Sequence, residues 1–326
     1  MFFSQKSPTH YVPLGQLRGH SGGIVRLRAT EDGKLLASGG TDGTKIWNLS
    51  TMAMVATPKS SQIRKATTAL VWIKRGDDLS ETLFYGTAQG YLVCWEKAEK
   101  DQARTILREI SCVRIVNPAE ISDLAFNAPS NRLAVCHRGG VVQVYTLGSN
   151  MILQQVFSLG LKDFVPRAIV FGEMTGNEKD IMVFGLYSGD IYTFRGSKGN
   201  VNGASWNVGG LIGDAALHLE GGALCMDEPS TGVNIYRLDR RELVKSFPVK
   251  VTKPAMRSRQ VAFVDEHKKE YKSVVSGSDH GMVYVFDRRS GDVEVLKVHA
   301  DDWVQTVAVS VFILIVGGAE RTNSGC

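Results

Sequence analysis

The sequence contains few cysteines and no long apolar segment. Five cysteines in 326 residues are too few, and odd in number, for a small domain held together by disulfides. The longest apolar run, Val307–Val316, is far shorter than the about 20 residues of a membrane-spanning helix. The first residues, MFFSQKSPTHYVPLG, lack the apolar stretch and the small-residue cleavage site of a secretory signal. We therefore expect no membrane association and an intracellular, reducing environment.

The sequence also lacks the motifs of common catalytic and metal-binding sites. The seven histidines are scattered, no two cysteines form a Cys-x-x-Cys pair, and no glycine-rich loop opens a helix. Cys136 and His137 are adjacent, but neighbouring residues of a strand point to opposite faces of the sheet. We therefore predict no catalytic residue, no metal site and no cofactor, and we expect that the protein is not an enzyme.

Positive charge is concentrated in one segment. The net charge is +5, and Arg237–Arg259 alone contains eight basic and two acidic residues. A basic segment favours an acidic partner or nucleic acid. A solvated loop without a partner is the plainer alternative.

An apolar run, a glycine turn and a closing aromatic residue occur together six times. Further strand-like runs flank each copy, so each unit is predicted to have four short strands. Repeated units of four short strands are typical of the blades of a β-propeller. The closing aromatics are Trp47, Trp95, Tyr145, Phe194, Tyr236 and Phe286, and the turn glycines before them are Gly43, Gly90, Gly140, Gly189, Gly232 and Gly281.

The first unit resembles a repeat of the WD-repeat family, a family of β-propellers. Residues Leu17–His20 resemble the Gly-His signature of that family, and Thr41–Trp47 resemble its turn and its tryptophan strand. The resemblance implies a structural tetrad in which a turn carboxylate holds an imidazole, the imidazole reaches a strand hydroxyl, and a tryptophan N–H completes the network. The residues in these positions are His20, Ser38, Asp42 and Trp47.

The other units depart from this pattern. The turn before Trp95 contains no aspartate. The unit that closes with Phe286 keeps Ser276 and Asp279 but has no matching histidine. Glycine pairs after apolar runs also occur in kelch propellers, but the downstream aromatic pattern of kelch repeats is missing.

We therefore predict an all-β, seven-bladed β-propeller of the WD-repeat type, which forms one domain over residues 1–326 and has an incomplete last blade. A seventh unit begins at Val298-His299 but has no closing aromatic. Either the chain is a truncated or mis-spliced form of a longer propeller, or Ala319–Cys326, a rearranged N-terminus or a partner supplies the missing strand. The predicted blades are 17–60, 61–112, 113–159, 160–208, 209–248, 249–297 and 298–326, with 9–16 as the closing strand.

The resemblance implies a non-enzymatic scaffold that binds a protein or peptide through one face of the propeller. The basic loop Val249–Arg259 favours an acidic or phosphorylated segment as the partner. Association with nucleic acid or chromatin through the same loop is the alternative, and steep salt dependence would distinguish it. Arginine and aromatic residues dominate interface hot spots, although each aromatic could instead be buried between blades. The predicted partner-binding residues are Arg138, Phe164, Tyr187, Lys253, Arg257, Arg259 and Trp303.

Overall fold

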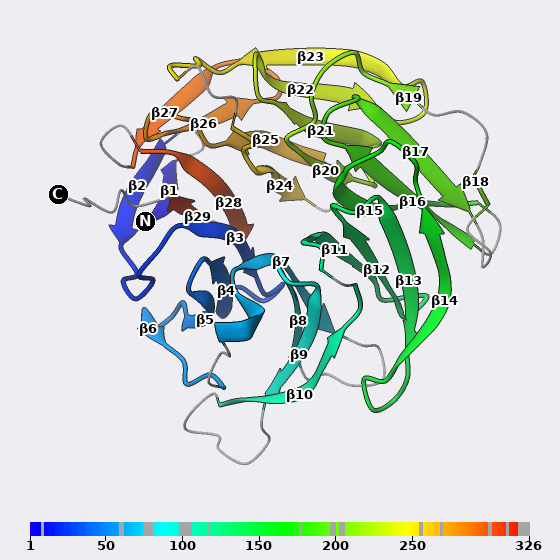
Figure 1. Cartoon of the computed structure of the whole chain (residues 1–326). Coiled ribbons are helices and arrows are strands. Elements are labelled where there is room, and N and C mark those ends of the chain that lie inside the picture. Colours follow the sequence, from blue (N-terminus) through cyan, green and yellow to red (C-terminus); the bar gives the residue numbers. More distant parts are fainter. Residues whose placement is uncertain are drawn as a thin grey trace, which may run out of the picture. The chain divides into compact units, whose positions relative to one another are not determined.

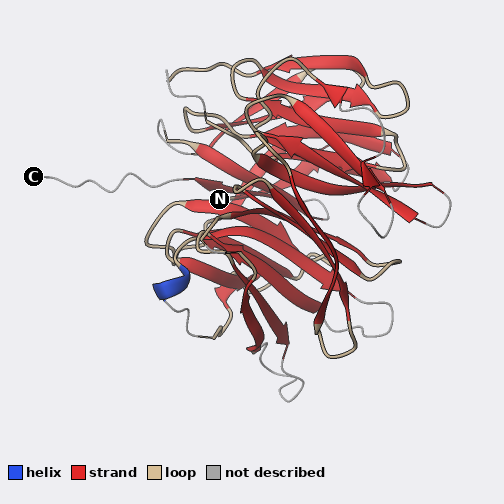
Figure 2. Cartoon of the chain, turned by 45° about the vertical axis from the view of Figure 1, so that its right-hand side comes forward, coloured by secondary structure: helices blue, strands red, loops and turns tan. Residues whose placement is uncertain are grey.

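The computed structural model shows an all-β protein. Strands make up nearly all of its regular structure, and the helical element in the described residues is η1, a 3-10 turn at Gln62–Arg64 (Figure 2). The residues that the structure describes are 1–7, 10–58, 62–74, 81–97, 106–116, 118–175, 178–195, 200–201, 206–253, 257–267, 270–298, 302–310 and 313–318.

The chain divides into two compact units. Unit 1 comprises Met1–Asp42, Leu49–Met52 and Ile212–Cys326, and unit 2 comprises Gly43–Asn48 and Ala53–Leu211. The strand order β3-β4-β5-β6 contributes two strands to each unit. The prediction of a single domain stays a prediction.

Unit 1 contains two four-stranded antiparallel sheets built from consecutive strands. Their orders are β20-β21-β22-β23 and β24-β25-β26-β27. In the same unit β3 pairs with β4. The bounds are β3 (Ile24–Ala29), β4 (Leu35–Gly40), β20 (Asp214–His218), β21 (Ala223–Glu228), β22 (Gly232–Arg237), β23 (Glu242–Pro248), β24 (Val261–His267), β25 (Glu270–Ser276), β26 (Met282–Asp287) and β27 (Val293–Lys297).

Unit 2 contains three sheets of consecutive strands. Their orders are β10-β9-β8-β7, β11-β12-β13-β14 and β15-β16-β17-β18, and β19 also pairs with β17. In addition β5 pairs with β6. The bounds are β5 (Gly43–Asn48), β6 (Ala53–Met54), β7 (Thr67–Lys74), β8 (Glu81–Thr87), β9 (Tyr91–Lys97), β10 (Leu107–Arg114), β11 (Ile121–Asn127), β12 (Arg132–His137), β13 (Val141–Leu147), β14 (Leu153–Gly160), β15 (Pro166–Thr175), β16 (Glu178–Gly185), β17 (Asp190–Arg195), β18 (Asn200–Val201) and β19 (Trp206–Asn207).

A further sheet of unit 1, the terminal sheet, joins segments from both ends of the chain. Its order is β2-β1-β29-β28, and Figure 1 shows β1 and β2 in blue beside β28 and β29 in red. The N-terminal strand β1 pairs with β29 from Phe2↔Ile315 to Ser4↔Ile313. The bounds are β1 (Phe2–Ser7), β2 (His10–Gly15), β28 (Val304–Ser310) and β29 (Ile313–Gly318).

Two parts of the fold prediction need correction. The β-propeller fold has six blades of consecutive strands in the described chain, not seven, because the terminal sheet draws its strands from both ends. The expected gap in the last blade is also absent from the described terminal sheet. The N-terminal segment forms two strands instead of one, and β1 fills the predicted gap. This pairing agrees with the alternative in which a rearranged N-terminus supplies the missing strand.

Glycine turns and closing aromatics recur at the same place in these blades. Each closing aromatic lies on the third strand of its blade, as Trp95 does on β9 and Phe286 does on β26. All six predicted turn glycines have positive φ. At Gly140, with φ 77°, a Cβ atom would lie 2.7 Å from the carbonyl oxygen of Leu161, so both the backbone conformation and the space require glycine.

Polar groups on or beside the first strands connect neighbouring sheets. In unit 1 Asp214 Oδ2 on β20 accepts the N–H of Val261 on β24 at 3.2 Å, and Gln260 N–H donates to the carbonyl oxygen of Gln305 on β28 at 2.8 Å. In unit 2 Asp123 Oδ2 on β11 accepts the N–H of Ile169 on β15 at 3.1 Å. These bonds fix the positions of adjacent first strands and satisfy buried backbone groups.

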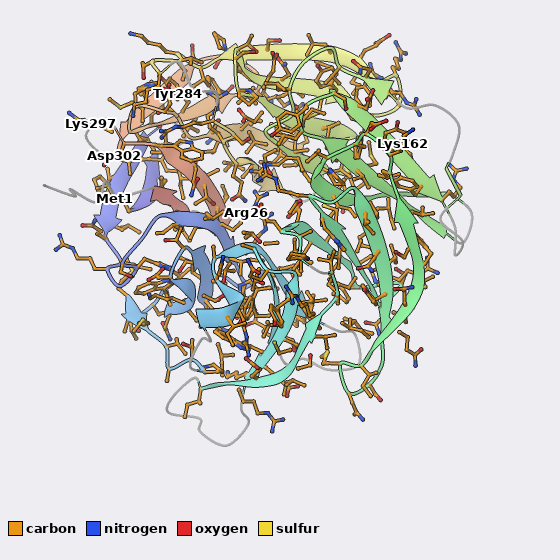
Figure 3. All side chains as sticks on the ribbon, in the orientation of Figure 1. Met1, Arg26, Lys162, Tyr284, Lys297 and Asp302 are labelled. Atoms are coloured by element: carbon orange, nitrogen blue, oxygen red, sulfur yellow. The ribbon has the colours of Figure 1, made fainter. Side chains whose placement is uncertain are left out.

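A buried ion pair links the first strands of two sheets of unit 1 that are not neighbours in sequence. Arg26 Nη1 on β3, labelled in Figure 3, donates to Asp214 Oδ1 at 2.9 Å. Both side chains are nearly inaccessible to water. Since a buried charge without its partner is costly, this pair requires β3 and β20 to keep their relative positions.

Tyr11 on β2 tests whether the N-terminal strands belong to the folded core. It is buried in a cluster with residues such as Val283, Leu296 and Leu314. We expect Tyr11→Ala to lower the free energy of unfolding by about 3 kcal/mol, because it removes a large aromatic ring from a packed core. Leu14→Ala, at an exposed position of the same strand, is the control and should change it by less than about 0.5 kcal/mol. Equal, small effects of both variants in urea unfolding would show that β2 is not docked.

Candidate functional site

His20, Ser38 and Asp42 form a hydrogen-bonded network in unit 1. His20 precedes β3, Ser38 lies on β4, and Asp42 lies in the turn after β4. His20 Nδ1 is 2.5 Å from Asp42 Oδ1, and His20 Nε2 is 2.7 Å from Ser38 Oγ. The fourth residue of the implied tetrad, Trp47, is buried on β5 of unit 2.

Asp42 also fixes the segment that leads into β3. Its Oδ2 atom accepts the N–H of Ser21 at 2.9 Å and the Ser21 hydroxyl at 3.2 Å. A Cβ atom at Gly40 would lie 2.8 Å from His20 Nδ1, so this turn has no room for a larger residue. The network therefore stabilises a turn, which is a structural role.

Asp279 performs the same task in the blade that ends with β27. Asp279 Oδ2 accepts the N–H groups of Thr252 at 2.8 Å and Lys253 at 2.7 Å, and Asp279 Oδ1 accepts the Thr252 hydroxyl. His280 Nδ1 is 2.8 Å from Asp279 Oδ1. The sequence showed no histidine matching His20 in this blade, and here backbone N–H groups of the preceding loop take that place.

Trp95 lies in the blade of unit 2 whose turn contains no aspartate. A different set of residues surrounds it. Arg64 forms two hydrogen bonds with Glu109, at 2.6 and 2.8 Å, and one with the hydroxyl of Tyr85 at 3.2 Å. Trp95 Nε1 donates to Glu109 Oε2 at 3.3 Å. The guanidinium of Arg64 lowers the pKa of Glu109. Sequence reasoning missed this cluster because Arg64 and Glu109 lie far apart in the chain and match no repeat position.

The basic loop of unit 1 contributes residues with two different environments. Arg259 is buried, and its guanidinium contacts Asp227, with Nη2 2.6 Å from Oδ1. It is therefore not available to a partner on the surface. Arg257, in contrast, lies over the ring of Trp303 at 4.9 Å from the ring centre, and both residues are half-buried. Lys253 is also half-buried and follows Thr252 in the segment held by Asp279.

The predicted residues of unit 2 also differ in exposure. Phe164 is 5% exposed and packs edge-on against Tyr192, so the structure places it in the core. Tyr187 is 66% exposed at the turn between β16 and β17. Arg138 lies in the turn between β12 and β13 and forms an exposed ion pair with Glu120 at 3.3 Å.

The comparison with protein families agrees with the geometry of the first blade. Residues 11–48 match the family model described as WD domain, G-beta repeat. This segment of the chain therefore matches a WD repeat. All four tetrad positions lie inside the matched segment. A comparison with curated proteins found no match.

In the described part of the chain, no group of three or more His, Cys, Asp or Glu side chains is arranged to hold a metal ion. None of the helices in that part is long and apolar enough to span a membrane.

The loop-holding role of Asp279 predicts a pH dependence of stability. Burial alone would raise the pKa of Asp279, but the hydrogen bonds from His280, Thr252 and Lys253 outweigh it and lower the pKa to about 2. Because this folded-state value is below the ordinary value of 3.8, the stabilisation is fully present above about pH 4 and is lost as the pH falls toward 2.

Comparing the wild type with Asp279→Asn isolates this contribution from the other carboxylates. We expect the variant to be less stable at pH 7 by about 2 kcal/mol and the difference to shrink as the pH falls from 4 to 2. Urea unfolding at several pH values measures it, with Glu220→Gln, at an exposed carboxylate, as the control. A difference that stays constant between pH 7 and pH 2 would contradict the assignment.

Proposed function

We propose that this WD-repeat propeller is a scaffold that binds an acidic or phosphorylated protein segment at a loop surface of unit 1. WD-repeat propellers are generally protein-interaction scaffolds. The loop surface consists of Lys250, Lys253, Arg257 and Trp303. The observation that carries the proposal is the pair of Arg257 and Trp303 beside a backbone segment that Asp279 holds in place.

The Arg257–Trp303 pair has the chemistry of an anion-binding anchor. Within the described residues no carboxylate forms an ion pair with Arg257, and its guanidinium is oriented by the ring of Trp303. A guanidinium that stacks on an aromatic ring keeps its N–H groups for a carboxylate or phosphate, which it can bind through two parallel hydrogen bonds. Tryptophan and arginine are also the residue types most enriched in interface hot spots.

The backbone at Thr252 and Lys253 is held in place by hydrogen bonds. Asp279 fixes the N–H groups of Thr252 and Lys253, and Lys250 projects into solvent just before them. A backbone segment that is already held in place loses less conformational entropy when a partner binds. These contacts support a defined docking surface at this loop.

The thiols of the protein support an intracellular location as part of this proposal. Cys94, Cys112, Cys136 and Cys225 form no disulfide, and three of them are buried. Burial raises the pKa of Cys94 to about 12, so this thiol is unreactive at neutral pH. Unpaired cysteines are usual in proteins of reducing compartments.

Charge reversal at the loop surface tests the proposed function. The probes are a fluorescein-labelled Glu-rich decapeptide, the same peptide with a central phosphoserine, and a 20-base-pair DNA duplex. We expect the peptides to bind the wild type, and the triple variant Lys250→Glu, Lys253→Glu, Arg257→Glu to bind them at least about tenfold more weakly. Arg259 is left unchanged because it pairs with buried Asp227.

The control carries the same change of charge elsewhere, as Lys65→Glu, Lys162→Glu and Arg240→Glu, all at exposed positions. Fluorescence anisotropy at several salt concentrations measures each affinity, and a thermal melt confirms that both variants fold. Equal binding of the peptides to both triple variants would overturn the proposal. Binding to the duplex alone, falling steeply with salt, would indicate the nucleic-acid function instead.

A further inference from the structure

The strand β27 differs from the other outer strands of the described sheets in its regularity. It pairs with β26 over five consecutive positions without a register shift. The outer strands β2, β10, β14 and β23 each pair through at least one shift, and β6, β18 and β19 have two residues each. Bulges and short length discourage the addition of another strand to an edge, so among the outer strands of the described sheets β27 is the one that has neither.

The hydrogen-bond ladder shows which residues of β27 face outward. Val298 N–H donates to the carbonyl oxygen of Gly281 at one end of the ladder, and Asp287 N–H donates to that of Asp292 at the other, both at 2.9 Å. Bonded and non-bonded pairs alternate in an antiparallel ladder. Both ends therefore give the same result, namely that the N–H and C=O groups of Val293, Val295 and Lys297 point away from β26.

The side chains of these three residues share one face and reach solvent. Val293 is 49% exposed, Val295 is 48% exposed, and Lys297 is exposed. Lys297, labelled in Figure 3 together with Tyr284 of β26, forms no ion pair in the described part of the chain. The residues whose backbone groups point outward therefore carry two β-branched apolar side chains and one cation.

A packed aromatic layer holds this face in place. Val295 lies opposite Tyr284 and Val293 lies opposite Phe286, so the four side chains are on the same side of the sheet. Tyr284 stacks on Phe286, with ring centres 5.9 Å apart, and Phe286 stacks on Phe247 of β23 at 4.7 Å. The edge therefore lies on a layer of packed aromatic rings.

We propose that β27 accepts an extended segment of a partner protein as an additional antiparallel strand. In that strand, alternate residues would be acidic opposite Lys297 and apolar opposite Val295 and Val293. Main-chain hydrogen bonds would supply affinity and the alternate side chains would supply specificity, as in other cases of strand addition. This site is separate from the loop surface of the proposed function and does not depend on it.

A second copy of the chain fits this edge less well than a partner segment. If two β27 strands paired antiparallel about Val295, Lys297 of each strand would lie opposite Val293 of the other. The two lysines would then have no carboxylate opposite them. An acidic residue of a partner segment provides the complementary charge.

Proline at Val295 tests the proposal without disturbing the ladder. Because the N–H of Val295 points outward, Val295→Pro removes a donor to an added strand but no bond to β26. The matched control is Ser246→Pro on β23, at an exposed residue whose N–H also points away from its sheet by the same alternation, since Val249 N–H bonds to Thr231.

The probe is the fluorescein-labelled peptide Thr-Asp-Thr-Val-Thr-Val-Thr, with a Lys-for-Asp version as the charge control. We expect the peptide to bind the wild type and the Ser246→Pro variant equally. It should bind the Val295→Pro variant at least about tenfold more weakly, and the Lys-for-Asp peptide should bind the wild type at least about tenfold more weakly. Hydrogen exchange of the wild type with the peptide should slow at Val293, Val295 and Lys297. This measurement tests the site even if Val295→Pro fails to fold.

Three results would overturn the proposal. The first is equal binding of the peptide to a folded Val295→Pro variant. The second is unchanged exchange at the three amides when the peptide is in excess. The third is a dimer of the wild type that Val295→Pro abolishes, which would assign the edge to a second copy. The loop-surface triple variant should bind this peptide normally, so failure here and failure of the proposed function are distinguishable.

Discussion

The structure depends on polar groups that join the first strand of one sheet to the first strand of the next. Each four-stranded sheet can bury its apolar faces only against neighbouring sheets, but apolar contact alone does not fix a position. The carboxylates of Asp123 and Asp214 do so, since each accepts a backbone N–H from the adjacent sheet. The ion pair of Arg26 with Asp214 adds a second, longer link within unit 1. The outer strands are positioned in turn, because they pair through their sheets with these first strands.

Features that repeat along the chain could be predicted from the sequence. The turn glycines do have positive φ, since no other residue tolerates that conformation so close to a neighbouring carbonyl group. The first blade could be identified down to the bonds of His20 with Ser38 and Asp42, because its signature is intact. The shared role of Asp279 was only half visible, since its partners are backbone N–H groups that leave no mark in a sequence.

Features that depend on distant parts of the chain could not be predicted in this way. The pairing of β1 with β29 depends on register between segments from opposite ends, and local pattern carries no information about it. The sequence predicts that Arg259 is a surface cation in a basic loop. In the structure it is buried in an ion pair with Asp227 on β21. Phe164 reads as a loop aromatic, but the neighbouring strands enclose it. In each case the tertiary partner decided the exposure of the side chain.

The terminal sheet also bears on the order in which the protein is assembled. Its contact between Met1 and Val316 joins residues separated by 315 positions, so β1 leaves the ribosome long before the strand beside which it ends. During synthesis β1 and β2 remain without β29 until the blades that lie between them in the sequence have been made. Contacts of such high sequence separation form late and slowly. A strand edge left open for that time is a place where chaperones or other chains can bind, so efficient closure bears on yield in the cell as much as on stability.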